Sequence, residues 1–338
     1  MIGQPLATIA FVFRERLSPT ISCLQHLLDT TPRGSYALIC VDAGAPESIA
    51  ASLRQLAARH GFTLIRSEDY LSPNQSRNLA LQRVRTRYVV FVDNDVSVGP
   101  DWLNPLVGCA EETGAWLVAP LFMQSLRGEL RVHMFGGTVG VRDKEGRPTY
   151  FEKHDLAHEF LNGERQLVRQ ATDFIEFHTL LMNMDAYRSL GPLDEKLFNC
   201  SEHSDLCLAV KNAGKQIYLE PSSVITYQIP DRLDAVDTEY FALRWSEAWT
   251  QASLERLAEK YAIPLEDSGL RVVGDWIRQH RQGARTVYPR IRSLLGTKWH
   301  QKFRRHIGQP LEKWRNLRQY PSSEYVKNRK VDARVISG

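Results

Sequence analysis

The sequence lacks the marks of several protein classes. Its 338 residues contain no run of roughly 20 apolar residues, the length that crosses a bilayer as a helix, so we expect no membrane span. The first residues show no basic leader followed by an apolar run and a cleavage site, so we expect a cytoplasmic protein. The five cysteines form an odd set without a Cys-x-x-Cys pair, which argues against a disulfide framework and against a zinc site.

The composition that is present is ordinary for a soluble enzyme, with 43% hydrophobic and 24% charged residues. The length allows two domains, or one large α/β domain with an appendage, and we favour the second. The net charge of +4 is unevenly spread, because residues 278–330 hold fifteen Lys and Arg against two acids. The C-terminal tail therefore differs electrostatically from the rest of the chain.

Strands and helices alternate over the first 120 residues. Short apolar runs predict strands at 7–12, 36–41, 62–65, 88–92 and 115–119. The stretches between them have helical spacing, and Ser18 before Pro19 predicts the N-cap of the first helix. This alternation predicts a mostly parallel sheet that binds ligands outside the carboxyl ends of its strands.

The pattern changes after about Leu121. Residues 127–164 are rich in glycine and charge without a clear period, which predicts hairpins and mobile loops. Regular structure is predicted again as a strand at 179–182 and helices at 185–190 and 204–213. Residues 241–261 then continue at a helical period.

Asp93 and Asp95 follow the strand predicted at 88–92. Alternate residues of a strand project to the same side, so the two carboxylates share one side. Mg²⁺ and Mn²⁺ bind through one or two carboxylates and complete their shell with phosphate oxygens and water. The pair therefore suits a nucleotide diphosphate, and the alternative is an ordinary strand-to-helix turn with Asp as its cap.

Several motifs in a fixed order resemble glycosyltransferase family 2, whose members share the GT-A fold. The resemblance runs from about Ala7 to Tyr227 and rests on Phe13-Arg14-Glu15-Arg16, Asp42, Ser76-Arg77-Asn78, the pair Asp93 and Asp95, and the segments 191–195 and 201–208. It implies an α/β GT-A fold with a mostly parallel sheet flanked by helices. It also implies metal-assisted, inverting transfer of a sugar from a nucleoside diphosphate to a hydroxyl acceptor, either a glycan or a lipid-linked molecule.

The resemblance also implies roles for individual residues. Asp93 and Asp95 would bind a divalent metal, Mn²⁺ or Mg²⁺. The residues implied to contact the donor nucleotide are Arg14, Asp42, Arg77, Asp93 and Asn94. Many members of the family carry a late histidine as a third metal ligand after the strand that ends here at Tyr227, but this chain has Gln228 at that place.

The catalytic base is expected in the segment 201–208. Family members usually carry Glu-Asp-x-Asp there, and His203 occupies the second position, the one assigned as base. A base must reach the acceptor hydroxyl and have a suitable pKa, so Glu202 or His203 could serve. Asp205 lies one helical turn further on, although an acid near a helix N-terminus also has a purely electrostatic role. His203 could instead contact the metal or a phosphate.

Weaker signals lie between these motifs. Glu176 and His178 precede the strand at 179–182, in the region where family members contact the donor sugar and the acceptor. They form either an acceptor site or ordinary edge-strand polarity. His133 could cover the acceptor or be structural, and Trp245 could stack on an acceptor sugar or pack in the core.

We expect a catalytic domain at 1–230, with a nucleotide-binding half at 1–120 and an acceptor half at 121–230. A helical extension at 231–275 would pack on it, and a basic, aromatic-rich helical tail would occupy 276–338, with helical stretches at 291–303 and 311–317. Basic helices with interleaved aromatics suit an anionic membrane surface, which would place the enzyme on the inner face of the cell membrane. An oligomer contact or a solvated face has the same composition, and nucleic acid is a less favoured partner.

Two other functions stay open at this level. A sugar nucleotidyltransferase uses a related sheet, but it normally has a glycine-rich phosphate loop after the first strand, and residues 13–20 contain no glycine. A non-catalytic protein that binds a sugar nucleotide or a glycan is suggested by His203 in the place of the usual base.

Overall fold

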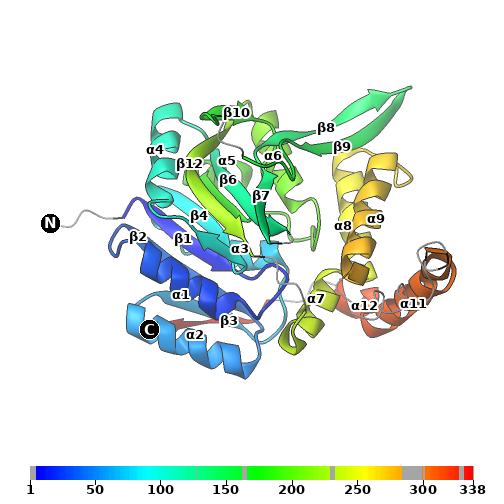
Figure 1. The fold of residues 1–338 in the computed structure, drawn as a ribbon, viewed down its shortest axis with the longest axis horizontal. Coiled ribbons are helices and arrows are strands. Elements are labelled where there is room, and N and C mark those ends of the chain that lie inside the picture. Colours follow the sequence, from blue (N-terminus) through cyan, green and yellow to red (C-terminus); the bar gives the residue numbers. More distant parts are fainter. Residues whose placement is uncertain are drawn as a thin grey trace.

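The computed structural model describes residues 5–126, 128–161, 166–228, 233–283, 299, 301–326 and 331–337. Most of its strands belong to one central sheet (Figure 1): β1 (Ala7–Val12), β2 (Tyr36–Ala43), β3 (Thr63–Ser67), β4 (Tyr88–Asp93), β5 (Val96–Val98), β6 (Leu117–Leu126), β7 (Glu129–Met134), β10 (Gln170–Thr172), β11 (Thr179–Asn183), β12 (Ile217–Tyr227) and β13 (Ala333–Ser337). A separate hairpin consists of β8 (Gly137–Lys144) and β9 (Arg147–His154).

The helices cover the sheet and extend beyond it on one side (Figure 1). They are α1 (Thr20–Thr30), α2 (Glu47–His60), α3 (Pro73–Leu81), α4 (Leu103–Thr113), α5 (Met184–Leu190), α6 (Glu202–Asn212), α7 (Thr238–Arg244), α8 (Glu247–Tyr261), α9 (Ser268–Gly283), α11 (Gln309–Gln319) and α12 (Ser322–Tyr325), with the short turns η1 (Ala235–Asp237) and η2 (Arg304–Gly308).

The strand order of the main path is β10-β12-β6-β11-β4-β1-β2-β3-β13. The pairs of β1 with β2 and β4, of β2 with β3, and of β6 with β12 are parallel, whereas β11 runs antiparallel between β4 and β6. Every residue of β1 and β4 is buried, as expected for strands covered on both faces. The predicted α/β fold with a mostly parallel sheet is confirmed.

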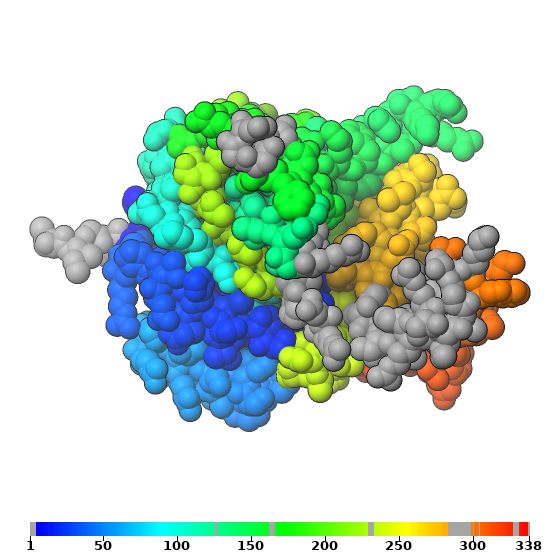
Figure 2. Space-filling model, in the orientation of Figure 1, coloured from blue at the N-terminus to red at the C-terminus, as the bar shows by residue number. Residues whose placement is uncertain are grey.

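The region after β6 contains the predicted hairpin. β8 and β9 pair antiparallel over their whole length and project from the body of the molecule (Figure 2). In the middle of β9, the backbone amide of Tyr150 donates a hydrogen bond to Asp267 Oδ1 at 3.2 Å, which joins the hairpin to the segment before α9. The hairpin and the C-terminal helices therefore support each other.

The sequence predicts that Ser18 caps the first helix, and this prediction is wrong. α1 begins at Thr20 after Pro19, without a capping side chain among the described residues. The Ser18 hydroxyl instead donates to Asp237 Oδ2 at 2.8 Å, and the amides of Leu17 and Ser18 donate to Asp237 Oδ1. The loop after β1 is thus held by η1, far along the chain.

The single helical pattern predicted over 241–261 is divided into α7 and α8. The break lies at Trp245 and Ser246, where the Ser246 hydroxyl accepts the amide of Trp249 and caps α8. Trp245 is only 2% exposed, and its indole donates to Glu15 Oε2 at 3.0 Å. Trp245 therefore packs in the core and does not face an acceptor.

The C-terminal region is fastened to the sheet at several points. Glu15, in the loop after β1, accepts hydrogen bonds from Tyr227 and Trp245, and His280 of α9 lies 3.0 Å from its Oε2. In the same region the buried Arg281 donates to Glu312 of α11 and to Glu247 of α8. Removing one partner of such a buried pair typically costs about 3–5 kcal/mol.

The described parts of the predicted tail are structured. α9 continues through the expected boundary at 275/276, α11 covers the predicted helical stretch 311–317, and β13 pairs antiparallel with β3 at the sheet edge. Most of the stretch predicted helical at 291–303 lies outside the described residues. Among the residues described, none of the helices is both long and apolar enough to cross a membrane.

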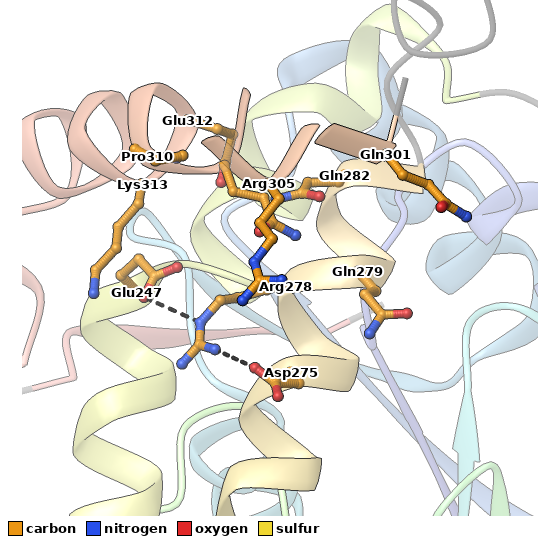
Figure 3. Close-up of a pocket in the computed structure, with 11 residues that line it drawn as sticks. Glu247, Asp275, Arg278, Gln279, Gln282, Gln301, Arg305, Pro310, Glu312 and Lys313 are labelled. Carbon is orange, nitrogen blue, oxygen red and sulfur yellow. Dashed lines mark hydrogen bonds and ion pairs between the residues drawn. The ribbon is translucent and has the colours of Figure 1, made fainter. Parts of the chain in front are cut away.

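A cavity of about 670 Å³ opens between α8, α9 and α11 (Figure 3). Its lining is mostly polar or charged and includes Arg278, which donates to Asp275 at its edge. It is separate from the strand ends where the sequence motifs converge. The five cysteines, Cys23, Cys40, Cys109, Cys200 and Cys207, are all buried free thiols.

Candidate active site

The ends of β1 and β4 bring the first set of predicted residues together. The strands are parallel neighbours with Val12 opposite Asp93, so Arg14 and Asp95 follow at the same edge of the sheet. Arg14 Nε lies 3.8 Å from Asp93 Oδ2, and Arg14 Nη1 lies 3.5 Å from Asp95 Oδ2. The structure therefore brings Arg14, Asp93 and Asp95 into one cluster.

Arg77 of α3 completes the surroundings of Asp93. Its guanidinium donates to Asp93 Oδ1 at 3.0 Å, with both side chains about 1% exposed. The same guanidinium stacks on Phe177, 3.8 Å from the ring centroid. One oxygen of Asp93 is thus committed to Arg77, while Oδ2 faces Arg14.

Asp95 is the least satisfied carboxylate of the cluster. Its side chain is 1% exposed, and neither oxygen has a hydrogen-bond partner in the described structure. Burial raises the pKa of Asp95 to about 7, since the charge of Arg14 offsets only part of the desolvation. A buried acceptor without a partner costs about 1–3 kcal/mol, so the arrangement is suited to a cation.

His178 lies beside the same carboxylates. Its Nδ1 is 4.0 Å from Asp93 Oδ2, and ligand atoms of Asp93, Asp95 and His178 all lie within 4.8 Å of one another. Burial, helped by the charge of Arg14, lowers the pKa of His178 to about 3, so the imidazole is neutral. The set of two carboxylates and a neutral imidazole fits a divalent metal such as Mn²⁺.

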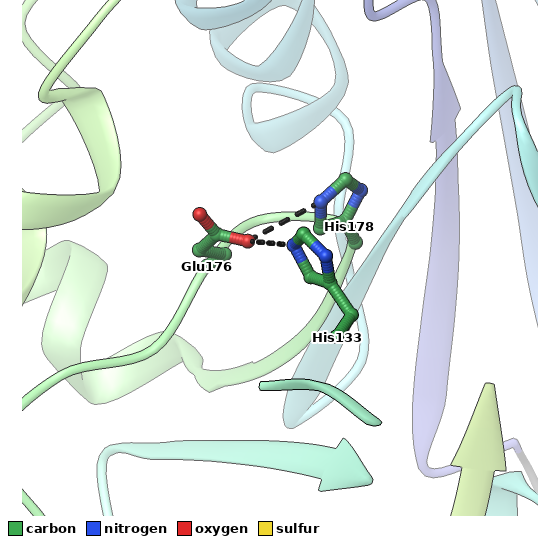
Figure 4. Close-up of side chains that lie close together, drawn as sticks. All are labelled: His133, Glu176 and His178. Carbon is green, nitrogen blue, oxygen red and sulfur yellow. Dashed lines mark hydrogen bonds and ion pairs between the residues drawn. The ribbon is translucent and has the colours of Figure 1, made fainter. Parts of the chain in front are cut away.

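A second cluster begins on the other side of His178. His178 Nε2 lies 3.3 Å from Glu176 Oε2, and His133 Nε2 lies 2.8 Å from the same oxygen (Figure 4). Burial raises the pKa of Glu176, but the charge and hydrogen bond of His133 and the hydrogen bond of His178 outweigh it and hold the pKa well below its usual range. Glu176 and His178, both predicted as acceptor residues, thus lie together next to the carboxylates Asp93 and Asp95.

The network extends to the hairpin. His154 Nε2 lies 3.8 Å from Glu176 Oε1 and 3.8 Å from Glu152 Oε1, and Glu152 accepts the hydroxyl of Ser204 at 3.0 Å. Burial lowers the pKa of His154, but the hydrogen bond to Glu152 and the charges of Glu176 and Glu152 outweigh burial and raise the pKa to about 9. His154 also lines a cavity of about 560 Å³ within the part of the chain that is predicted to bind the acceptor, 121–230.

The two remaining residues predicted to contact the nucleotide make structural bonds. Asn94 accepts the amide of Arg14 at 2.9 Å and donates to the Arg16 carbonyl and the Thr20 hydroxyl, so it holds the loop after β1. Asp42, fully buried, pairs with Arg66 and accepts the amide of Ala45 at 2.8 Å. Contact of Asn94 or Asp42 with a nucleotide stays a prediction.

The candidates for the base lie at the start of α6. Glu202 Oε1 accepts from Arg244 at 2.8 Å, whereas its buried Oε2 has no partner among the described residues. Burial raises the pKa of Glu202, but the charges of Arg244, His203 and Arg77 outweigh it and set the pKa at about 2. Both oxygens of Asp205 are held by Lys260 and Tyr261.

His203 is more accessible than Glu202 and lies against Phe174, with ring centroids 5.4 Å apart. The residue before α6, Ser201, has a φ of +60°, a left-handed conformation that costs energy in a residue other than glycine. Such strain beside Glu202 is typical of functional sites.

Several residues of the site have no strong local signal. Tyr227 accepts a hydrogen bond from Arg14 at 2.6 Å and donates to Glu15 at 3.0 Å, and Gln124 lies 3.0 Å from His133 Nδ1. In the sequence, Tyr227 is an ordinary residue at the end of a strand, and Gln124 is an ordinary residue within one. Neither has a local feature that indicates a functional role. Glu15 could have been found as an acid between two arginines at a strand end.

Comparison with known proteins agrees with this geometry. The sequence matches the profile of Glycosyl transferase family 2 over residues 9–188, more than half of the chain. It is 24% identical over 159 residues to the pre-mycofactocin glycosyltransferase of Mycobacterium tuberculosis, covering 46% of this chain and 30% of that protein. It is 28% identical over 123 residues to mouse polypeptide N-acetylgalactosaminyltransferase 15, covering 35% and 19%.

A third relative, the uncharacterized protein y4gI of Sinorhizobium fredii, is 27% identical over 221 residues, covering 63% of this chain and 23% of its own. The chain thus spans less than a third of each of these curated relatives.

Two solved structures have a similar fold. GalNAc-T7 with UDP, GalNAc and Mn²⁺ aligns with a TM-score of 0.55 and 14% identity over 94% of this chain and 58% of its own. The mannosyltransferase PcManGT from Pyrobaculum calidifontis, in complex with GDP-Man and Mn²⁺, aligns with a TM-score of 0.51 and 12% identity over 96% and 85%. At these identities the likeness concerns the fold alone.

Proposed function

The chain belongs to Glycosyl transferase family 2 and is a glycosyltransferase, and we propose that it moves a sugar from a nucleoside diphosphate to a hydroxyl group with inversion at the anomeric carbon. The observation that carries the proposal is the buried Asp95, with two unpartnered oxygens beside Asp93 and His178 at the carboxyl ends of parallel strands. Ligands bind at this edge in open α/β sheets.

The donor's diphosphate would approach the cluster from the side of Arg14. The Arg14 side chain is 16% exposed, whereas those of Asp93, Asp95 and Arg77 are each about 1% exposed. Arg14 therefore offers a positive charge to an incoming diphosphate. UDP and GDP-mannose in the two similar structures support a donor of this class.

The metal expected with such a donor would be held by Asp93 and Asp95. When bound there, a divalent cation would neutralise charge on the departing diphosphate, a contribution of several kcal/mol in metal-assisted reactions. The unpartnered oxygens of Asp95 fit that group, and both similar structures contain Mn²⁺.

Glu202 is the base that the geometry favours. Its Oε2 is buried and has no hydrogen-bond partner within the described structure, so this oxygen is left to accept a proton. In the proposed step, the acceptor hydroxyl gives its proton to Glu202 as its oxygen bonds to the anomeric carbon. The bond from that carbon to the diphosphate breaks, and the diphosphate leaves with the electron pair.

The acceptor would enter on the side of the histidine network and the cavity lined by His154. The C-terminal helices add a surface that suits a lipid-linked acceptor. Trp276, Trp299 and Trp314 are each more than half exposed, in a region rich in Lys and Arg. Exposed aromatic and basic side chains together favour the interface of an anionic membrane.

A panel of labelled nucleotide sugars with Mn²⁺ tests the proposal. We expect one donor to release its nucleoside diphosphate faster when a hydroxyl acceptor is added, and the product to have the opposite anomeric configuration by NMR. Retention of configuration would contradict the inverting step. Saturable donor binding without any release, with every acceptor tried, would indicate a binding protein.

Co-sedimentation with liposomes tests the membrane surface separately. We expect the full chain to bind vesicles that contain anionic lipid and not vesicles of neutral lipid. Replacing Trp299 and Trp314 by Ala should reduce that binding. Equal recovery of both proteins in the supernatant would contradict a membrane role for this surface.

A further inference from the structure

We infer that His178 is the third protein ligand of the divalent cation at Asp93 and Asp95, and that Glu176 and His133 fix the orientation of its ring. This inference rests on the proposed function and names a ligand of the same site. The third ligand would then come from the residue before β11. It would not come from the position after β12, where many family members have a histidine and this chain has Gln228.

The sheet itself puts His178 next to Asp93. β11 runs antiparallel to β4 with Thr179 opposite Val92, and the amide of Asp93 donates to the carbonyl of His178 at 3.0 Å. Side chains at directly opposed positions of antiparallel strands lie on the same face and contact each other. The backbone therefore fixes the approach of His178 to the carboxylates.

Unpartnered atoms of His178 and of Asp95 indicate where the metal ion would lie. His178 Nδ1 is buried without a hydrogen-bond partner in the described structure, as are both oxygens of Asp95. The His178 side chain is 2% exposed, so Nδ1 is shielded from bulk solvent. Two ligands of one Mg²⁺ at about 2.1 Å lie at most about 4.2 Å apart, and Nδ1 is 4.0 Å from Asp93 Oδ2.

The opposite ring nitrogen has the partner that a metal ligand needs. Nε2 lies 3.3 Å from Glu176 Oε2, so a proton on Nε2 donates to a carboxylate and leaves the lone pair of Nδ1 free. Histidine ligands commonly donate their other N–H to a carboxylate in this way. His133, held in turn by Gln124, contacts the same Glu176 oxygen at 2.8 Å (Figure 4).

The ring is also packed in place. Tyr227 lies 4.5 Å from it, His133 4.9 Å and Phe122 5.7 Å, measured between ring centroids. Gln228 lies beside the site, since its backbone amide donates to the Asp95 carbonyl at 2.7 Å, and its side-chain nitrogen donates to the Ser97 hydroxyl at 3.0 Å. Next to Asp93 and Asp95, His178 is the described side chain that offers an unpartnered imidazole nitrogen.

His133, Glu176 and His178 could hold a metal by themselves. Their facing atoms, however, already contact one another, so that cluster is satisfied without an ion. A metal there would leave His178 Nδ1 and Asp95 without partners. An ion at the inner position, between Asp93, Asp95 and His178, would give a partner both to His178 Nδ1 and to an oxygen of Asp95.

Titration of the full chain with Mn²⁺, followed by electron paramagnetic resonance, tests the inference. We expect His178→Gln to weaken Mn²⁺ binding by about 100-fold or more, beyond the roughly 10-fold to 100-fold loss that is typical when only a residue supporting a ligand is changed. In the wild type, pulsed measurements should detect coupling of Mn²⁺ to one imidazole nitrogen, and His178→Gln should remove it. His133→Gln is the matched control, which should keep the nitrogen coupling with a smaller loss of affinity.

Three results would overturn the inference: no nitrogen coupling in the wild type, coupling that persists in His178→Gln, or coupling that is lost in His133→Gln. Asp95→Asn separates this failure from that of the proposed function. If Asp95→Asn and the wild type bind Mn²⁺ equally, the metal site itself is wrong. If only Asp95→Asn loses binding, His178 alone is wrong.

Discussion

The proposed donor end of the site, at Asp93 and Asp95, and the proposed acceptor side, around Glu176, pair their carboxylates with different kinds of side chain. At the ends of β1 and β4 the partners of the carboxylates are the arginines Arg14 and Arg77. Around Glu176 the partners are the histidines His133 and His154. Arginine keeps its charge at every pH that a protein tolerates, whereas histidine changes charge near neutrality.

This difference suits the two halves of a transfer reaction. A leaving diphosphate needs fixed positive charge, and a reacting hydroxyl needs groups that hold or accept a proton. The two sets meet at His178, whose ring nitrogens face Asp93 on one side and Glu176 on the other. Changes on the donor end should therefore affect metal and nucleotide, and changes on the acceptor side should affect proton transfer and pH dependence.

The strongest way to break the donor end is Asp95→Asn. The change keeps the shape of the side chain and removes the charge that we propose binds the metal, so we expect turnover to fall by about 10³-fold, equivalent to about 4 kcal/mol. Because the buried, unpartnered carboxylate is removed, the free energy of unfolding should stay the same or rise. Activity with saturating Mn²⁺ and urea unfolding measure the two effects. An unchanged rate would refute the metal assignment.

On the acceptor side, the pair Glu202→Gln and His203→Gln identifies the base. General base catalysis contributes about 10²–10⁴-fold, and we expect that loss in kcat for Glu202→Gln. His203→Gln should lose less than about tenfold, since Glu202 has the free buried oxygen. Binding of the nucleoside diphosphate serves as the control for Glu202→Gln, because that variant also weakens the pair with Arg244. The reverse order of effects would assign the base to His203.

Arg14→Gln should sharpen the contrast by moving two affinities in opposite directions. The guanidinium lies 3.5 Å from Asp95 and repels a cation there, so its removal should tighten binding of Mn²⁺ alone by roughly tenfold at pH 8. Binding of a nucleoside diphosphate with Mn²⁺ should weaken, because Arg14 is the exposed positive charge of the cluster. Calorimetry measures both affinities. A loss of both would mean that Arg14 mainly holds the loop together.

Much of the donor end could be predicted from the sequence. The apolar run at 88–92 and the acids that follow it placed Asp93 and Asp95 at a strand end, and the order of motifs brought in Arg14 and Arg77. These features are local, since strand alternation and parallel crossovers determine where the side chains emerge. The structure brings all four together.

The contact between the two sides, through His178 and Asp93, could not be predicted from local sequence patterns. His178 meets Asp93 only because β11 inserts antiparallel between β4 and β6, a register that depends on pairing across 85 residues. Glu15 likewise finds Tyr227, Trp245 and His280 at separations of more than 200 residues. Such contacts depend on tertiary packing, which the local pattern does not contain.

The smallest expected effect lies on the acceptor side, at His154. Its folded pKa of about 9 exceeds the usual value of about 6.5, so its stabilising effect is full below pH 6.5 and is lost as pH rises through 9. His154→Gln should therefore lower the free energy of unfolding at pH 6 by on the order of 2 kcal/mol, with little effect at pH 9.5. Denaturant unfolding of both proteins at the two pH values measures the difference. An equal difference in the free energy of unfolding at both pH values would mean that His154 stabilises the protein by packing. Its charge, and its ion pairs with Glu152 and Glu176, would then contribute nothing measurable.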